Sequence, residues 1–201
     1  MSNKSRPVVL VHGLWDTPHL FNKLKNRLEE FELSVFAPHL PHNYGRISIS
    51  VLAQDLQLHI EKQFGKDVVI DLVGFSMGGL IGRVWLQEMH GAERTSRFIS
   101  VGSPHKGTFT AQLVPSWFLA GVAEMKRSSI FLNELNSDFL ALNEVECISF
   151  FCVLDLMVFP GWEAVLPVGS AFRLPVLTHK ALMNNSVAID RIVGKILRRD
   201  I

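Results

Sequence analysis

The chain has 201 residues, a length typical of one domain with a single hydrophobic core. It carries 20 Lys and Arg against 19 Asp and Glu, so its charge does not favour nucleic acid as a partner. Its apolar fraction is 48%, yet it has no run of about 18 uncharged apolar residues, so we expect no transmembrane segment.

Short apolar runs alternate with amphipathic segments along the chain. The first run, PVVLVHG, predicts a buried strand, and the leucine and phenylalanine spacing after it predicts a helix over 17–31. SVFAP predicts a second strand, which ends at the turn HLPHN, and 49–64 predicts a helix that stops at Gly65. DVVIDLVG predicts the third strand, and a third helix is expected from Ser76 to about His90.

The second half of the chain continues this alternation after one interruption. RFISVG, CISFFCVL and FRLPVL predict three further strands, and 181–197 predicts a final helix. The segment 108–146 is long, partly helical and rich in aromatic residues, so we expect a small cap insertion above the sheet. The whole pattern predicts a single α/β domain over 1–201, with a mainly parallel central sheet and helices on both faces.

The N-terminal sequence passes from a polar tail straight into the first strand. It lacks the longer apolar region and small-residue cleavage site of a secretory signal, so we expect a cytoplasmic protein. Cys147 and Cys152 lie an odd number of residues apart on one predicted strand, so they should face opposite sides of the sheet as free thiols. We expect no metal site and no cofactor.

The pentapeptide Gly74-Phe75-Ser76-Met77-Gly78 matches the pattern G-x-S-x-G. It directly follows the apolar strand VVIDLV and opens a helix, which is the strand–turn–helix context of a nucleophile elbow. Ser76 is therefore the candidate nucleophile. The alternative interpretation is a glycine-rich turn in which Ser76 only caps the helix.

Acyl transfer to a serine needs two backbone N–H groups aimed at the developing oxyanion. One is expected from Met77, which follows the serine, and the other from Leu14, which follows the strand end at His12-Gly13. His12 is a possible base by residue type. Its position before a glycine at a strand end favours instead a role in shaping this loop.

Motifs along the chain resemble one known family. V-H-G-L-W near the N-terminus, G-F-S-M-G-G at the elbow and V-G-S-P-H-K-G-T after the fourth strand resemble small bacterial lipases and esterases of the α/β-hydrolase superfamily. D-L-M-V-x-P and T-H-K-A-L-M extend the resemblance over nearly the whole chain. It implies an α/β-hydrolase fold, hydrolysis of carboxylic esters, and oxyanion donors at Leu14 and Met77. The chain departs from the family at Phe75, where a histidine commonly precedes the serine.

Triad partners in this fold follow the serine in the order acid, then histidine. His179 lies after the last predicted strand at a helix start, whereas His90 ends the helix that Ser76 opens, so His179 is the candidate base. Asp155 follows the strand CISFFCVL, at the edge where Ser76 should emerge, and is the candidate acid. Three rival acids are placed less well: Asp71 lies inside the nucleophile strand, Asp138 in the insertion and Asp190 on the last helix. Glu163 is the reserve candidate.

Four residues are candidates for contact with substrate: Trp15, His105, Trp117 and Phe118. The loop that carries His105 lines the site in the family this chain resembles, and a purely structural role is the alternative for that residue. We expect a small-molecule or lipid ester as the partner, no nucleic acid, and at most a transient contact with a membrane surface. The alternative functions are a thioesterase or acyltransferase with the same triad, or a non-catalytic binding module.

Overall fold

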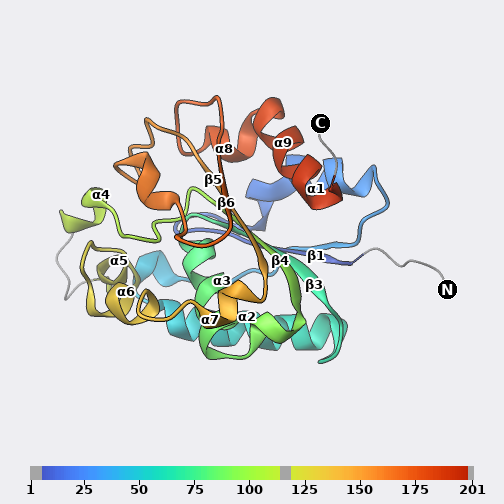
Figure 1. Ribbon diagram of the computed structural model, residues 1–201, viewed down its shortest axis with the longest axis horizontal. Helices are drawn as coiled ribbons and strands as arrows, with labels where there is room; N and C mark the ends of the chain where they lie inside the picture. The colour runs from blue at the N-terminus through green and yellow to red at the C-terminus, as the bar shows by residue number, and fades with distance from the viewer. Residues whose placement is uncertain (1–5, 114–118, 199–201) are drawn as a thin grey trace.

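The computed structural model of the protein describes residues 6–113 and 119–198. Within these residues, six parallel strands form one sheet in the order β2-β1-β3-β4-β5-β6, which confirms the expected α/β fold (Figure 1). Because all strands run the same way, their carboxyl ends meet at one edge of the sheet. The strands are β1 (Val8–Val11), β2 (Val35–Phe36), β3 (Ile70–Phe75), β4 (Thr95–Val101), β5 (Glu146–Phe151) and β6 (Ser170–Arg173).

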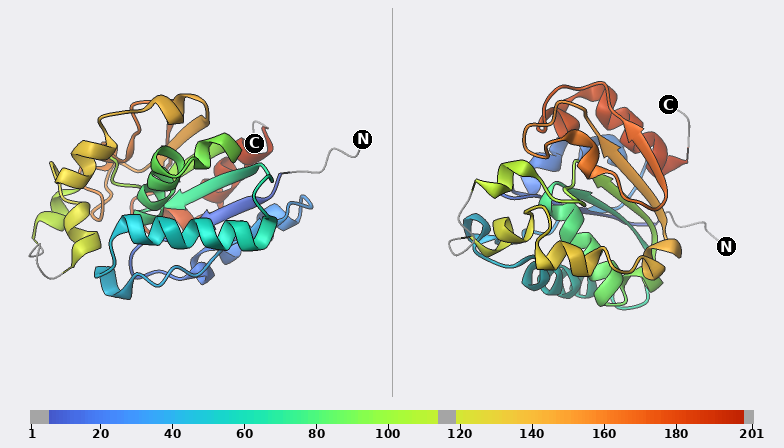
Figure 2. Two further views of the ribbon diagram at one scale, coloured as in Figure 1. Left: turned by 90° about the horizontal axis from the view of Figure 1, so that it is seen from below. Right: turned by 60° about the vertical axis from the view of Figure 1, so that its left-hand side comes forward.

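Helices cover both faces of the sheet (Figure 2). On one face lie α1 (Asn22–Glu29), α8 (Ala181–Asn184) and α9 (Ser186–Leu197), and on the other lie α2 (Ile49–Phe64) and α3 (Met77–Glu88). The insertion supplies the short helices α4 (Phe109–Gln112), α5 (Ala120–Glu124), α6 (Ile130–Leu135) and α7 (Leu140–Asn143). Short 3-10 helices complete the described elements: η1 (Pro18–Phe21), η2 (Asn43–Gly45), η3 (Gly91–Arg94) and η4 (Gly161–Ala164).

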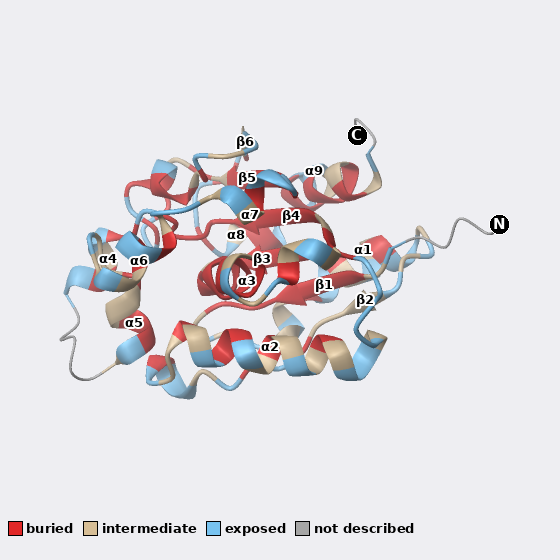
Figure 3. Cartoon of the chain, turned by 60° about the horizontal axis from the view of Figure 1, so that its bottom comes forward, coloured by how far each residue is buried: buried red, intermediate tan, exposed pale blue. Residues whose placement is uncertain are grey.

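The sheet divides the core into two layers. Val9 and Val11 pack toward α2 and α3, while Val8 and Leu10 of the same strand pack toward α1 and α9. Since both faces are covered, the central strands are buried along their length and read as continuous apolar runs (Figure 3). The burial of both faces explains why strand periodicity is weak in the sequence while the strands themselves are easy to recognise.

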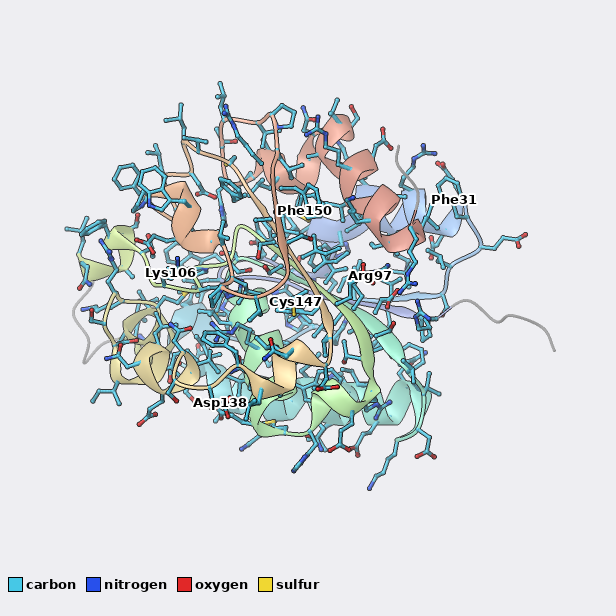
Figure 4. The ribbon with its side chains drawn as sticks, in the orientation of Figure 1. Phe31, Arg97, Lys106, Asp138, Cys147 and Phe150 are labelled. Atoms are coloured by element: carbon cyan, nitrogen blue, oxygen red, sulfur yellow. The ribbon has the colours of Figure 1, made fainter. Side chains whose placement is uncertain are left out.

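The cysteines lie as predicted on opposite faces of the sheet, both as buried free thiols. Figure 4 labels Cys147 together with Phe150, which comes from the same strand and packs on the other face. Burial raises the pKa of Cys147 to about 12, and burial followed by the nearby Asp155 raises the pKa of Cys152 to about 11. Both groups are therefore held as neutral thiols at ordinary pH.

We expect Ellman's reagent at pH 8 to modify neither cysteine of the folded protein within minutes, because only the thiolate reacts and both raised pKa values lie well above that pH. The released thiolate dye, measured by absorbance, reports the reaction. The same protein in urea should react at both positions, since unfolding removes the burial that raises the pKa. Rapid modification of the native protein would contradict this result.

Two helices differ from the sequence prediction for local reasons. The helix expected over 17–31 begins as the 3-10 turn η1, with Pro18 at its first position, and becomes α-helical only from Asn22. The helix expected over 181–197 divides at Asn185, which is extended and whose side chain accepts the Ala188 N–H at 3.2 Å to cap α9. A capping asparagine inside an apolar pattern was the available signal.

The last strand lies earlier than FRLPVL suggested. β6 covers Ser170–Arg173, and Leu174 N–H adds one further bond to the Phe151 carbonyl at 2.8 Å. Pro175 has no N–H to donate, so the ladder cannot continue through the predicted segment. In the segment 108–146, the described helices α4, α5 and α6 lie beyond the carboxyl ends of the strands (Figures 1 and 2).

A charged cluster occupies the opposite edge, where the strands begin. Arg97 is fully buried, and its guanidinium lies 3.6 Å from Asp71 and 3.1 Å from Glu146. It also donates to the Ile196 carbonyl of α9 at 2.7 Å, while Arg6 pairs with Asp71 at 3.3 Å. This amino-edge cluster ties the start of the sheet to the end of the last helix.

Candidate active site

Ser76 lies in a strained turn between β3 and α3. Its φ of 53° and ψ of −126° place a non-glycine residue in a sparsely populated region, where functional sites store backbone strain. Its N–H donates to the Val101 carbonyl of β4 at 2.9 Å. The close packing of this turn requires Gly78, because a Cβ there would lie 2.1 Å from the Val11 carbonyl oxygen. The local sequence therefore presents Ser76 at the carboxyl edge of the sheet, as a nucleophile elbow does.

His179 and Asp155 form a buried pair at this edge. His179 Nδ1 lies 2.6 Å from Asp155 Oδ2. Asp155 Oδ1 in turn accepts the N–H groups of Met157 at 2.9 Å and Val158 at 3.0 Å, so the carboxylate is fixed by its own loop. With both carboxylate oxygens engaged, Asp155 holds the imidazole in one orientation, with Nδ1–H toward the carboxylate.

The His179 ring adjoins the same strand ends as Ser76. It packs on Phe75, with ring centroids 4.6 Å apart, and on Gly102, where a Cβ would lie 3.1 Å from the ring. Phe75 and Gly102 are the chain neighbours of Ser76 and Val101, which are themselves joined by a hydrogen bond. His179 Nε2 is buried and has no hydrogen-bond partner in the described part of the chain. Since Nδ1 faces the carboxylate, Nε2 carries the lone pair of a neutral imidazole.

The loop after β1 approaches Ser76 from another side. Gly13 is so close that a Cβ there would lie 2.8 Å from the Ser76 Cβ and 3.3 Å from its Oγ. Only glycine allows this approach. Leu14 follows directly, and Met77 is the first residue of α3, where backbone N–H groups lack a carbonyl partner within the helix. Both candidate oxyanion donors thus lie in segments that adjoin Ser76.

His12 orients the peptide that carries the Leu14 amide. Its Nε2 accepts the Leu40 N–H at 3.0 Å, so the proton of the neutral ring is on Nδ1, which lies 3.1 Å from the Gly13 carbonyl oxygen. Burial lowers the pKa of His12 and favours this neutral form. The Gly13 carbonyl also accepts the Asp16 N–H at 3.4 Å, and a trans peptide points the Leu14 N–H the opposite way. These contacts favour the loop-shaping role over a role as base.

The competing carboxylates are engaged elsewhere. Asp71 and Asp190 pair with arginines, Asp71 at the amino edge of the sheet and Asp190 with Arg27 at 3.0 Å. Asp138 accepts the N–H of Leu140 at 2.7 Å in the insertion. Glu163, the reserve candidate, pairs with Arg127 at 3.1 Å. None of these four contacts a histidine side chain among the described residues.

The residues expected to contact substrate have different outcomes. Trp15 is 59% exposed and directly follows Leu14, so its indole is accessible beside the site. His105 is fully buried, its carbonyl accepts the Asn136 side chain at 3.0 Å, and burial followed by the Arg83 charge lowers the pKa of its imidazole well below the usual value. Both nitrogens of the His105 ring are buried and have no hydrogen-bond partner among the described residues, so its contact with substrate stays a prediction. Two further candidates lie outside the described residues: Trp117 and Phe118.

Sequence reasoning missed two residues in or beside the loop of residues 12–16, which carries the candidate donor Leu14 and which we call the oxyanion loop. His42 Nε2 accepts the Trp15 N–H at 3.1 Å, although the sequence HLPHN indicated only a turn. Asp16 is half-buried, and burial raises the pKa of its carboxyl, while the charges of His179 and Lys180 act in the opposite direction. The position of Asp16 in H-G-L-W-D was the available signal, whereas the contact of His42 depends on how two distant loops pack.

Exposed apolar side chains gather at the loop that carries Asp155, which we call the acid loop, and on the neighbouring start of the insertion. We call this group the apolar rim. Thr108 joins the two segments, because its Oγ accepts the Phe159 N–H and donates to the Met157 carbonyl, both at 3.0 Å. Phe109 N–H also donates to the Phe159 carbonyl at 3.1 Å. The apolar rim consists of Phe109, Leu113, Leu156, Met157 and Phe159.

Residues 6–113 and 119–198 show neither a membrane-spanning helix nor a metal-binding cluster. They contain no helix whose length and apolar character would let it cross a bilayer. They also contain no group of three or more His, Cys, Asp or Glu side chains arranged to hold a metal ion.

Comparisons with known proteins concern both the sequence and the fold. A family model described as palmitoyl protein thioesterase matches residues 7–145. No curated protein sequence matches the chain.

Solved structures of lipolytic enzymes share the fold at low sequence identity. The mature lipase BlEst2 of Bacillus licheniformis superposes with a TM-score of 0.77 at 15% identity, over 97% of this chain and 93% of that one. Lipase B of Aspergillus fumigatus gives a TM-score of 0.80 at 18% identity, over 98% of this chain and 53% of that one, so this chain spans about half of that lipase. A structure reported for the metagenome-derived lipolytic enzymes LipS and LipT gives 0.70 at 14% identity, over 98% and 95%.

Proposed function

The chain belongs to the palmitoyl protein thioesterase family, and on this premise we propose that Ser76, His179 and Asp155 act as a catalytic triad on acyl esters. The family and the lipase-type fold identify the protein as a carboxylic ester hydrolase. The observation that carries the triad is the 2.6 Å contact between His179 and Asp155, placed at the sheet edge where Ser76 occupies its strained turn.

In the first half of the proposed reaction, Ser76 Oγ attacks the substrate carbonyl carbon and His179 Nε2 takes the hydroxyl proton. Asp155 accepts Nδ1–H and stabilises the imidazolium that forms. The carbonyl oxygen gains negative charge, and the N–H groups of Leu14 and Met77 stabilise it. The imidazolium then returns its proton to the leaving group as the tetrahedral intermediate collapses to an acyl-serine.

In the second half, water attacks the acyl-serine. His179 takes a proton from the water, and the same two backbone donors stabilise the second oxyanion. Collapse of this intermediate releases the carboxylic acid, and His179 returns the proton to Ser76 Oγ. The cycle consumes one water and restores every protein group, so the proposal requires no cofactor.

Thioester hydrolysis is the second candidate function, and the description of the matching family favours it. The same acyl-enzyme forms from an ester or a thioester, because the two substrates differ only in the group that leaves. Esters and thioesters of one acyl chain therefore test the choice directly. We suggest comparing p-nitrophenyl octanoate with octanoyl-CoA, with fluorophosphonate labelling mapped to Ser76 as the measure of an active nucleophile.

We expect kcat/KM to rise from acetyl to about hexanoyl or octanoyl esters. The exposed apolar rim beside the acid loop supports this, since each buried CH₂ contributes about 0.8 kcal/mol, or roughly fourfold when the gain is made in the transition state. A series of p-nitrophenyl esters of increasing length measures the slope. A preference for acetyl esters from the outset would contradict the proposed lipid-like acyl group.

Variants of the apolar rim test where this preference arises. Leu156→Ala with Phe159→Ala should flatten the chain-length slope. The matched control is Leu58→Ala, which removes a leucine that is 63% exposed on α2, on the helix layer away from the acid loop. If the control flattens the slope equally, the rim does not bind the acyl chain.

A further inference from the structure

The oxyanion loop holds a conformation that its own residues do not favour. Trp15 has a φ of 61°, in the left-handed region that a bulky non-glycine residue rarely adopts. Its side chain is 59% exposed, so packing of the indole contributes little to holding the backbone there. The Asp16 N–H bond to the Gly13 carbonyl closes this turn at 3.4 Å, and a second contact stabilises the left-handed backbone at Trp15 itself.

His42 supplies that contact. Its Nε2 accepts the Trp15 N–H at 3.1 Å. A backbone N–H can only donate, so this nitrogen carries the lone pair and the ring proton of the neutral imidazole is on Nδ1. His42 Nδ1 is itself buried without a hydrogen-bond partner among the described residues. Within the described residues, the hydrogen bond from the Trp15 N–H is thus the polar contact of the His42 ring.

The oxyanion loop and the loop of residues 39–42 are joined by two histidine side chains, one from each loop. Residues 12–16 contribute His12, which accepts the Leu40 N–H of the facing loop, and residues 39–42 contribute His42, which accepts the Trp15 N–H in return. The two rings also meet edge to face, with centroids 6.0 Å apart. The facing loop is therefore joined to the oxyanion loop at two points by bonds that run in opposite directions.

The side chain of the proposed donor is held by the same loop. At Gly45, which has a φ of 90°, a Cβ would lie 3.0 Å from Leu14 Cδ1 and 2.9 Å from Val122. Leu14 is thereby confined on its side-chain face. The peptide before it is oriented by the His12 contact to Gly13, and the peptide after it by the His42 contact to Trp15.

We propose that His42 is a positioning residue: by accepting the Trp15 N–H it holds the turn at Trp15, which places the Asp16 N–H on the Gly13 carbonyl and so keeps the Gly13–Leu14 peptide, with its Leu14 N–H, aimed at the reacting oxygen. This inference rests on the proposed function, in which Leu14 is an oxyanion donor. Without the His42 bond, Trp15 leaves the left-handed region, and the Asp16 N–H that follows it no longer reaches the Gly13 carbonyl. The Gly13–Leu14 peptide then loses one of the contacts that orient it, and the Leu14 N–H loses its alignment, although the fold and the triad remain intact.

The kinetic test uses two variants of His42 and a matched control. His42→Ala removes the acceptor, whereas His42→Gln places a carbonyl oxygen near the position of Nε2. We expect His42→Ala to lower kcat by about 10- to 50-fold, less than the loss of a whole donor, with KM within about twofold. His42→Gln should restore kcat to within about threefold of the native protein.

The control is His39→Ala, which removes a histidine from the same loop. His39 is exposed and stacks on His12 through its ring face, with centroids 5.7 Å apart, and it accepts no backbone N–H within the described residues. Its kcat should stay within about twofold of the native value. Measurements with p-nitrophenyl butyrate give kcat and KM for all three variants.

A second readout follows the Trp15 amide itself. Hydrogen exchange of this amide, measured by ¹⁵N NMR, should be about tenfold faster in His42→Ala than in the native protein, and His42→Gln should reverse the change. This measurement does not depend on turnover. If the native protein hydrolyses no ester but the exchange pattern holds, the proposed function fails while the loop contact stands.

Three outcomes would overturn the inference. One is native kcat in His42→Ala, and another is an equal kcat loss in His42→Ala and His42→Gln. The third is a rise in KM alone, which would mean that His42 contacts substrate instead of orienting the loop. If His42→Ala does not fold, His42→Gln tests the inference on its own. Its Trp15 amide should then exchange at the native rate and its kcat should stay within about threefold of the native value, and failure of either overturns the inference.

Discussion

Replacing Ser76 with alanine is expected to lower kcat by about 10³-fold or more while the protein remains folded. Alanine keeps the Cβ of the elbow but removes the oxygen that would form the acyl-enzyme, so no covalent intermediate can arise. The strained backbone should survive the change, because the Ser76 N–H bond to Val101 does not involve the side chain. Steady-state hydrolysis of p-nitrophenyl butyrate measures the loss, and circular dichroism confirms the fold.

Fluorophosphonate labelling gives this variant an independent readout. The native protein should be labelled at Ser76 and the alanine variant should not be labelled at all. Ser137→Ala provides the matched control, because Ser137 is exposed and its hydroxyl only donates to the Glu134 carbonyl at 2.6 Å. Retention of more than a few per cent of native activity by Ser76→Ala would remove Ser76 as the nucleophile.

Asp155→Asn is expected to lower kcat by roughly 10²- to 10⁴-fold. The asparagine can keep one carbonyl oxygen for the Met157 and Val158 amides, so the loop should hold its shape. Its amide nitrogen then faces His179 Nδ1 and cannot accept a proton from it. The imidazole must therefore adopt the other tautomer, with the proton on Nε2, where it can no longer take the proton of Ser76.

Two further substitutions separate this effect from general loss of charge. Asp190→Asn and Asp71→Asn each remove a carboxylate that pairs with arginine away from the histidine. Both should retain most of the native kcat, and Asp71→Asn should lower the thermal midpoint because it opens the cluster at the amino edge. If Asp190→Asn proves to be the inactive variant, the proposed acid is misassigned.

The sequence predicts elements well where one local signal dominates. The helix at Ile49–Phe64 has the predicted bounds, because the Ser48 side chain caps its start and Gly65 ends it. The parallel direction of the strands follows from the alternation of apolar runs and helices, whereas their order in the sheet was not predicted. The sixth strand was predicted at the right place in the chain but with wrong bounds, since the apolar run there contains Pro175, which cannot donate to a ladder.

In the candidate site too, features that depend on a local motif could be predicted, and features that depend on distant contacts could not. The strained turn at Ser76 can be read from a local motif, because backbone strain is a property of a few adjacent residues. The approach of Gly13 to Ser76 joins distant parts of the chain and follows from the placement of both residues at strand ends of one parallel sheet. His42 could not be predicted, because its role depends on a turn that packs against another loop 27 residues earlier in the chain. The full burial of His105 could not be predicted either, since residue type and loop position do not reveal how deeply a ring is buried.

The amino-edge cluster around Arg97 has a consequence for how the thermal stability of this enzyme depends on salt. Arg97 lies four residues before Val101 on β4, so roughly 13 Å separate it from the carboxyl end of that strand at about 3.3 Å per residue, more than the screening length of about 8 Å in physiological salt. We therefore expect ions that weaken the exposed parts of the cluster, such as Glu146 and Arg198, to lower the thermal midpoint of the fold more than they change kcat. Salt concentration is thus expected to alter the durability of this enzyme while its turnover stays close to the low-salt value.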